Sequence, residues 1–191
     1  GCAPTTMKQT EPTTKLALND RVTIELTTMT ALGDVIGRHE GLVVFVPYGL
    51  PGERVEVEIN HVRRHFVRGK IVQRFNTSPD RVEAPCKVFG VCGGCQWQHV
   101  AYDAQLRFKT DIVREQLTGI GKFADPPVRP CVASPQPYEY RNRMQFSVSE
   151  RGRPGFHAPG TREIHDVIEI EDCHISHPEI REHLRALAAA E

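Results

Sequence analysis

Three cysteines fall within ten positions of this 191-residue chain, at Cys86, Cys92 and Cys95, and Cys173 far downstream offers a fourth sulfur donor. Four thiolates bind either a tetrahedral zinc ion or an iron–sulfur cluster, because both centres prefer soft sulfur ligands. Structural zinc sites usually pair two short Cys-x-x-Cys turns, whereas three clustered ligands and one remote ligand are common around a four-iron cluster. The spacing therefore favours a cluster, and it leaves zinc or unliganded core cysteines as alternatives.

The other residues around these cysteines refine that interpretation. Gly93 and Gly94 allow unusual backbone angles and let amide groups approach cluster sulfurs, which a zinc ion would need less. Cys131 stands alone in a proline-rich segment with no neighbouring base, and Cys2 lies at the start of the chain. Lone cysteines are usually inert, so we assign no role to these two.

A second group of residues indicates binding to nucleic acid. Between His61 and Arg74 the sequence holds five Lys or Arg residues and no acidic residue. Cations bind phosphates, and an interleaved aromatic ring can stack on a base of single-stranded RNA. The alternative is a solvated strand face whose aromatic ring points into a core. The candidate RNA contacts in this stretch are Arg63, Arg64, Phe66, Arg68 and Lys70.

A third and weaker group comprises Arg141, Asn142 and Arg143. If this segment is a strand, the two arginines point to the same face, where they could bracket phosphates or a bulged base. The same side chains could instead pair with Glu139 or Glu150, and the pattern does not separate these two interpretations.

Composition limits the classes of protein to which the chain can belong. Lys and Arg together number 24, as do Asp and Glu, so the formal charge is zero and any affinity for nucleic acid must be local. The longest apolar run, Leu42–Val46, is far shorter than the about 18 residues of a membrane-spanning helix. The cysteines are too sparse for a disulfide scaffold, and no secretory signal is recognisable. We therefore expect a monomeric cytoplasmic protein with no membrane partner.

The first elements that must position these residues are short strands. Residues 1–15 have no periodicity and predict a disordered tail. In residues 16–78, five short strands are separated by glycines, and alternating apolar residues mark one face of each clear strand. This pattern predicts a small closed β-barrel of the oligonucleotide-binding kind.

Residues 79–191 predict a mixed α and β region. Apolar residues on one face indicate a helix from Tyr102 to near Gly119, and five prolines in residues 125–137 predict an extended surface connection. Two strands are expected, at Tyr140–Val148 and His165–Ile170, followed by a helix that begins at Pro178.

Several of these motifs together resemble one known family. The segment Cys86–His99, followed by Tyr102 and a helix, resembles the cluster-binding segment of the RNA (uracil-5-)-methyltransferases. The motif Tyr140–Arg143, a turn at Gly155–His157 and the pair Asp172–Cys173 resemble the same family, and the expected barrel resembles its TRAM domain.

The resemblance covers about residues 16–191 and implies the remaining features. It implies a 4Fe-4S cluster bound by Cys86, Cys92, Cys95 and Cys173, which we expect to act as a structural staple between distant segments. It also implies that the full-length enzyme binds 23S rRNA or tRNA and transfers a methyl group from S-adenosylmethionine (SAM) to carbon-5 of uracil.

The catalytic part of that family was not found in the sequence. No glycine-rich strand-to-helix turn is recognisable, so we expect no SAM-binding site and no catalytic residue in this chain. The segment Asp125–Arg129, with Cys131 nearby, looks like an Asp-Pro-Pro-Arg catalytic motif, but it carries an inserted Val128 and falls in a loop, so we interpret it as a coincidental match.

The predicted fold class is therefore an OB-like TRAM β-barrel followed by a small α+β iron–sulfur region, with the SAM-binding α/β domain absent. The predicted function is that of the N-terminal RNA-binding and 4Fe-4S-binding part of an RNA (uracil-5-)-methyltransferase, inactive by itself. The alternative is a free-standing, zinc-stabilised RNA-binding module without catalytic activity.

Overall fold

The computed structural model describes residues 16–189, so the expected tail at residues 1–15 lies outside the described residues. The chain divides into two compact units. The first extends to Ser78, and the second begins at Pro79 and also includes Ala31–Gly33.

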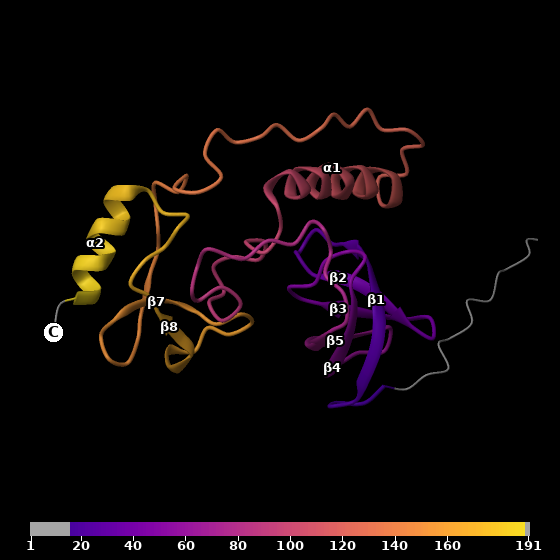
Figure 1. The fold of residues 1–191 in the computed structure, drawn as a ribbon, viewed down its shortest axis with the longest axis horizontal. Helices are drawn as coiled ribbons and strands as arrows, with labels where there is room; N and C mark the ends of the chain where they lie inside the picture. Colours follow the sequence, from indigo (N-terminus) through magenta and orange to yellow (C-terminus); the bar gives the residue numbers. More distant parts are fainter. Residues whose placement is uncertain (1–15, 190–191) are drawn as a thin grey trace, which may run out of the picture. The chain divides into compact units, whose positions relative to one another are not determined.

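The first unit is a closed β-barrel whose strands pair in the order β1-β2-β3-β5-β4 (Figure 1). The strands are β1 (Arg21–Met29), β2 (Val35–His39), β3 (Leu42–Val46), β4 (Arg54–Val62) and β5 (Phe66–Arg74). All paired strands are antiparallel except β3 and β5, which run parallel. The predicted five-stranded barrel is confirmed, and closure removes the open edges that could pair with another chain.

The barrel core follows the two-residue period of the strands. Alternate side chains point inward, and the buried hydrophobic residues of β1 and β4 are Val22, Ile24, Leu26, Met29, Val55, Val57 and Ile59. Gly69 of β5 permits the close approach of β4, because a Cβ atom there would lie 2.3 Å from Val57 Cγ1 and 2.6 Å from the Glu58 carbonyl oxygen. A larger residue at position 69 would push these two strands apart.

The first unit contains a buried carboxylate, Glu53. Glu53 is fully buried, and its side chain accepts hydrogen bonds from the backbone N–H groups of Leu50 (3.0 Å) and Ser78 (3.3 Å). Arg74 Nε lies 3.3 Å from the same carboxylate. Buried charges need such partners, so Glu53 connects the β3–β4 loop to the last residue of the unit.

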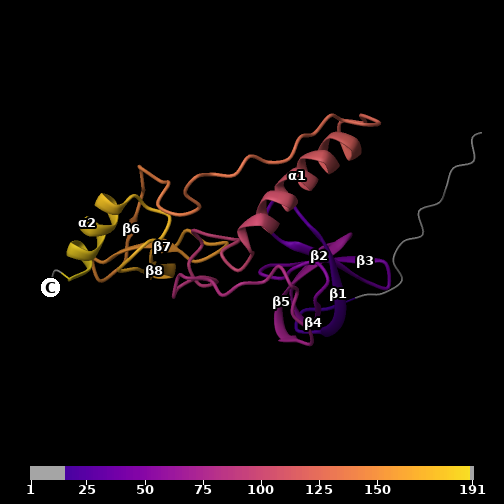
Figure 2. The ribbon, with the colours of Figure 1, turned by 45° about the horizontal axis from the view of Figure 1, so that its top comes forward.

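The second unit contains two helices and a small antiparallel sheet. Its elements are α1 (Tyr102–Gly119), β6 (Ser147–Val148), β7 (Pro154–His157), the 3-10 turn η1 (Ile164–Asp166), β8 (Val167–Glu169) and α2 (Pro178–Ala189). The strands pair in the order β6-β7-β8, and α2 packs against β7 (Figure 2). Both predicted helices are confirmed. The core of this unit is formed by Ile170, Cys173, Ile175 and Leu184.

A segment without helix or strand, residues 125–140, runs back along α1, and we call it the strap. Its position is visible in both ribbon views (Figures 1 and 2) and is set by two hydrogen bonds to α1. The Cys131 N–H donates to Thr110 Oγ1 at 2.9 Å, and the Ser134 N–H donates to the Tyr102 hydroxyl oxygen at 2.7 Å. The extended connection predicted from the prolines is therefore confirmed.

The two strands predicted in this unit are shorter than expected. Of Tyr140–Val148 only Ser147–Val148 is a strand, because the backbone at Arg141 pairs with another segment: its N–H donates to the Ile175 carbonyl and its carbonyl accepts from the His177 N–H. The predicted strand His165–Ile170 is a strand only at Val167–Glu169, since η1 occupies its beginning.

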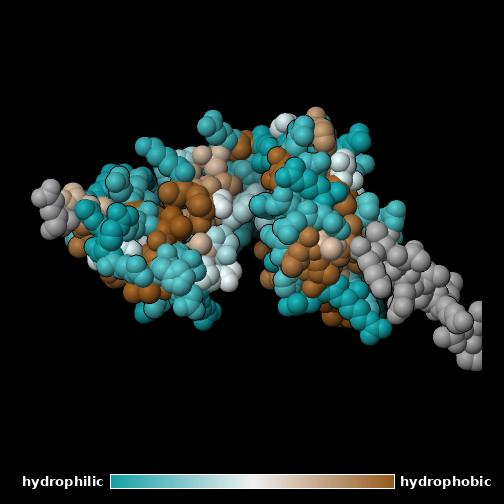
Figure 3. Space-filling view, turned by 90° about the horizontal axis from the view of Figure 1, so that it is seen from below, coloured by the Kyte–Doolittle hydropathy of each residue, from teal (hydrophilic) through white to brown (hydrophobic). Residues whose placement is uncertain are grey.

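The surface mixes hydrophilic and apolar side chains. On the face drawn in Figure 3, hydrophilic side chains surround smaller apolar patches in each of the two units. Among the described residues, no helix is both long and apolar enough to cross a membrane.

The buried carboxylate of the barrel gives a test of this fold. Glu53→Ala removes the acceptor for two backbone N–H groups and leaves Arg74 without its carboxylate partner, so we expect the free energy of unfolding to fall by about 2–4 kcal/mol. Urea denaturation followed by circular dichroism measures this loss. Glu56→Ala, whose side chain makes only a 3.8 Å ion pair with Arg21, should change stability by less than about 1 kcal/mol. Equal losses in both variants would refute the role assigned to Glu53.

Candidate metal centre and nucleic-acid interface

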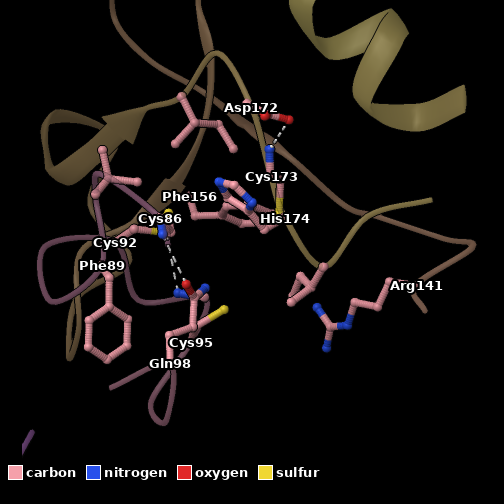
Figure 4. A pocket seen from close by; sticks show the side chains of 14 residues that line it. Cys86, Phe89, Cys92, Cys95, Gln98, Arg141, Phe156, Asp172, Cys173 and His174 are labelled. Atoms are coloured by element: carbon pink, nitrogen blue, oxygen red, sulfur yellow. Dashed lines mark hydrogen bonds between the residues drawn. The ribbon is translucent and has the colours of Figure 1, made fainter. Parts of the chain in front are cut away.

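The four cysteines singled out from the sequence line one small cavity in the second unit. Cys86, Cys92 and Cys95 lie in the segment before α1, and Cys173 lies between β8 and α2. Figure 4 shows these side chains, with Phe156, around a common space. The cavity has a volume of about 20 Å³, close to the about 10–15 Å³ that a single water molecule needs. The structure thus brings together all four predicted ligands.

The first three cysteines belong to a compact loop, residues 86–98, which we call the cysteine loop. Its turns are closed by backbone hydrogen bonds such as that from the Cys92 N–H to the Val88 carbonyl, at 2.9 Å. The Gly93 N–H donates to the His157 carbonyl of β7 at 2.9 Å, and a Cβ atom at position 93 would lie 2.7 Å from that oxygen. Glycine at position 93 therefore allows the loop to lie directly against β7.

The fourth cysteine is positioned by α2. The Cys173 N–H donates to Asp172 Oδ1 at 2.8 Å, and two atoms of the Arg181 guanidinium donate to the Asp172 carboxylate at 2.7 Å each. Arg185 donates to the same carboxylate at 2.9 Å. These hydrogen bonds hold the pKa of Asp172 well below its usual range and raise that of Arg181. Arg181 also pairs with Glu139, so it connects three segments of the unit.

The cysteine thiols share a partly desolvated environment. Burial raises the pKa of Cys92 and of Cys95, and the nearby cysteines raise both pKa values further. Two hydrogen-bond donors oppose this effect, the Gly94 N–H, 3.4 Å from Cys92 Sγ, and the Gln98 side chain at Cys95. The positive charge of Arg141 also lowers the pKa of Cys95. Several thiolates can coexist here only if a positive centre compensates their charge, as a bound metal does.

The cysteine sulfurs surround a space but do not meet at a point. In residues 16–189, no three His, Cys, Asp or Glu side chains are grouped closely enough to hold one metal ion. A zinc ion bound to four sulfurs at about 2.3 Å would bring those sulfurs to within about 4 Å of one another. The arrangement therefore differs from a formed single-ion site. Because the cavity has room for about one water, a larger inorganic group would enter only if the cysteine side chains rotated apart.

Two residues that support the cysteine site were not predicted as site residues. Gln98 is buried and accepts a hydrogen bond from the Cys86 N–H at 3.2 Å, and Arg181 acts through Asp172. The position of Gln98, three residues after Cys95, is visible in the sequence and could have marked it as a neighbour of the cysteines. Nothing in the sequence around Arg181 indicates its partner, because that pairing depends on how α2 packs.

The candidate RNA contacts on β5 already have partners in the barrel. Arg68 forms an ion pair with Asp34, and its guanidinium lies 5.7 Å from the centre of the Phe45 ring. Lys70 Nζ lies 2.8 Å from the Glu58 carboxylate. Burial raises the pKa of Asp34, and Arg68 partly offsets this. Contacts from Arg68 or Lys70 to phosphate would have to compete with these ion pairs.

The remaining candidates of this stretch differ in their environment. The ring of Phe66 packs edge to face against Phe45, with ring centres 5.3 Å apart, and is half-buried. Arg63 and Arg64 lie in the exposed turn between β4 and β5. The turn, more than the strand face, therefore presents cations to solvent.

The third predicted group has a different geometry from that expected. Arg141, Asn142 and Arg143 are exposed and lie outside any strand, so strand periodicity does not place the two arginines on a common face. Arg141 lines the cysteine cavity, and Figure 4 shows it beside Cys95. The alternative partner Glu139 is bound by Arg181.

Of the two cysteines without an assigned role, Cys131 lies outside the lining of the cysteine cavity. Cys131 belongs to the strap, where its thiol lies 3.8 Å from the Val132 carbonyl. Cys2 lies outside the described residues.

The chain is similar to one domain family and to several proteins of known sequence. Residues 19–72 match the TRAM domain family. A protein named uncharacterized RNA methyltransferase from Halalkalibacterium halodurans is 39% identical over 175 residues, covering 90% of this chain and 37% of its own length. A protein of the same name from Gloeobacter violaceus is 40% identical over 157 residues, covering 80% of this chain and 34% of its own length.

A solved structure is similar to most of the chain. The Pyrococcus abyssi tRNA (uracil-54, C5)-methyltransferase, in complex with S-adenosyl-L-homocysteine, matches with a TM-score of 0.54 and 25% sequence identity. The match covers 86% of this chain and 35% of the archaeal protein. The chain thus spans about a third of the length of these relatives, 37% and 34% in the two bacterial proteins.

These comparisons correct one part of the predicted fold class. The expectation that a SAM-binding domain is absent is overturned, because relatives that cover up to 90% of this chain are named methyltransferases and the structural neighbour was solved with S-adenosyl-L-homocysteine. The expectation rested on a missing glycine-rich turn, and a sequence that spans about a third of its relatives' length cannot support it.

The barrel and the cysteine-lined unit together therefore agree with relatives of one kind. Residues 19–72 match the TRAM domain family, and the chain is similar over most of its length to proteins named RNA methyltransferases.

Proposed function

We propose that this chain is the RNA-binding and cluster-binding part of an RNA methyltransferase that methylates carbon-5 of uracil with SAM as the methyl donor. The observation that carries the proposal is the gathering of Cys86, Cys92, Cys95 and Cys173 around one cavity in a chain whose relatives are named RNA methyltransferases. The substrate assignment is supported by the structural neighbour, whose name specifies uracil C5 of tRNA. Either tRNA or ribosomal RNA would supply such a uracil.

The proposed cofactor of the cysteine site is a 4Fe-4S cluster. Four sulfur donors fit the cluster's ligand requirement, and the cysteine side chains would rotate apart to admit it, because the cavity of about 20 Å³ has room for about one water. When bound, the cluster supplies four iron–sulfur bonds that join the cysteine loop to Cys173. Gly94 and Gln98 would direct N–H groups toward the ligand sulfurs, as they do toward Cys92 and Cys95. We assign the cluster a structural role because it would connect segments far apart in the chain.

Binding of RNA is assigned first to the barrel. Arg63 and Arg64 are the leading candidates for phosphate contacts, since both lie in an exposed turn. Arg68 and Lys70 would contribute if phosphate displaced their carboxylate partners, and Phe66 contributes to packing against Phe45. Arg141, Asn142 and Arg143 would provide further polar contacts from the second unit.

The first prediction concerns the cofactor. Protein purified without oxygen should be brown and contain about four iron and four sulfide ions per chain, and Cys173→Ser should lose most of both. Iron and acid-labile sulfide analysis, with the visible absorption spectrum, provides the measurement. Cys131→Ser is the matched control and should retain the cluster. A colourless wild-type protein with one zinc ion per chain would contradict the assignment and favour the zinc-stabilised alternative.

The second prediction concerns the support of Cys173. Arg181→Ala removes charge-assisted hydrogen bonds to Asp172 and Glu139, so the unfolding free energy should fall by about 2 kcal/mol and iron should be released faster to a chelator. Arg185→Ala removes a more exposed bond to the same aspartate and should cost less than about 1 kcal/mol. Both variants can be followed by urea denaturation and by the rate of bleaching. Indistinguishable behaviour of the two would argue against a positioning role for Arg181.

The third prediction concerns RNA. Replacing Arg63 and Arg64 together by Ala should weaken binding of single-stranded RNA and reduce the slope of log K against log salt by about one per lost phosphate contact. Fluorescence anisotropy at several salt concentrations measures this slope. Arg38→Ala, which removes a cation from β2 of the same barrel, should leave the slope unchanged. If the double variant keeps the wild-type slope, the β4–β5 turn has no part in RNA binding.

A further inference from the structure

A groove of about 1010 Å³ lies in the second unit, separate from the small cysteine cavity. Its walls come from α1, the strap and the cysteine loop, with Ala31–Gly33 contributing as well. This volume reaches the upper end of the about 300–1,000 Å³ typical of small-molecule sites, so the groove has room for more than one nucleotide-sized group. The cysteine site accounts for only one wall of this groove, and no function has been assigned above to the other walls.

The lining of the groove is rich in groups that recognise nucleobases. It contains four aromatic side chains, Trp97, Tyr102, Tyr138 and Tyr140, together with four glutamines. Aromatic faces stack on bases of any sequence, and amide groups pair with the base edges of unstacked nucleotides. Among the described residues that line the groove, Lys109 is the one with a charged side chain. The lining described here therefore contains a cation and no carboxylate. This balance of charge suits a polyanion.

Hydrogen bonds and a ring contact fix the positions of the three tyrosines that line the groove. The Tyr102 hydroxyl accepts the Ser134 N–H at 2.7 Å, which fixes the strap to the start of α1. Tyr138 packs edge to face against His174, with ring centres 6.4 Å apart. The neighbours of Tyr140 are fixed by backbone hydrogen bonds of 2.9 Å, from Glu139 to His174 and from Arg141 to Ile175, yet Tyr140 is 57% exposed. An exposed ring on a fixed backbone loses little conformational entropy when a base stacks on it.

The groove and the cysteine cavity share a wall. Gly94, Cys95 and Gln98 of the cysteine loop line both spaces, and Ile175 from the segment after Cys173 does so too. Whatever holds the four cysteines together therefore also holds one side of the groove.

We propose that this groove binds single-stranded RNA, with bases stacked on Tyr138, Tyr140 and Trp97 and a phosphate at Lys109. The inference rests on the proposed RNA-directed function and adds the groove to the RNA contacts proposed above for the barrel and for Arg141–Arg143. The RNA that occupies the groove is the unpaired segment of the substrate next to the uracil that is methylated.

The experiment uses the metal-loaded full-length protein and a short single-stranded oligouridylate that carries one 4-thiouridine. Irradiation should crosslink the RNA to peptides containing Trp97, Tyr138 or Tyr140, as mapped by mass spectrometry. Tyr140→Ala and Lys109→Ala should each weaken binding, the former by about fivefold or more, the loss expected when one base loses a stacking partner. Tyr140→Phe keeps the aromatic face and should bind as the wild-type protein does.

Phe123→Ala is the matched control, because Phe123 is an exposed aromatic residue of the same unit that lies outside the lining of the groove. Crosslinks confined to the barrel, with unchanged affinity in Tyr140→Ala and Lys109→Ala, would overturn the groove assignment and leave the proposed function standing. This result is also expected if another part of the full-length protein fills the groove. If the wild-type protein binds no RNA at low salt, the proposed function fails together with the groove.

Discussion

Four sulfur atoms from two distant segments share one partly desolvated space, and the architecture of the second unit depends on how that space is held. Two contacts hold it: the Gly93 N–H donates to the His157 carbonyl of β7, and the Arg181 guanidinium donates to the Asp172 carboxylate. The contact at Gly93 requires a residue without a Cβ atom. The contact at Asp172 requires α2, which carries Arg181, to pack against β7 as it does. The unit has only a short sheet and a small core, so an added inorganic crosslink would contribute a large share of its stability.

The barrel differs from the second unit in what stabilises it: an apolar interior and ion pairs between side chains of the barrel. The pairs of Arg68 with Asp34 and of Lys70 with Glu58 show why a basic strand is not automatically a nucleic-acid surface. Charge counted along the sequence overstates the positive field when acidic partners arrive from neighbouring strands. Arg63 and Arg64 lie in the exposed turn between β4 and β5, and their exposure to solvent makes them stronger candidates than the strand residues.

Local patterns in the sequence predicted the parts of the fold that depend on local chemistry. The alternation at Val22, Ile24 and Leu26 and the proline at position 178 predicted elements that the structure confirms. The strand expected at Tyr140–Val148 is confined to Ser147–Val148, because the backbone of Arg141 pairs with the segment after Cys173, which is a tertiary effect. Gathering of the four cysteines was anticipated from their spacing, while the role of Arg181 and the groove beside α1 depend on long-range packing that no short motif encodes.

Trp97, the single tryptophan of the sequence, lines the groove and directly precedes Gln98, which lines both the groove and the cysteine cavity. Because emission from indole depends on the polarity and the quenchers around the ring, this residue is a native optical probe within the cysteine loop. Its fluorescence can report on assembly of the cysteine loop without any attached label, and no other indole in the sequence would contribute background.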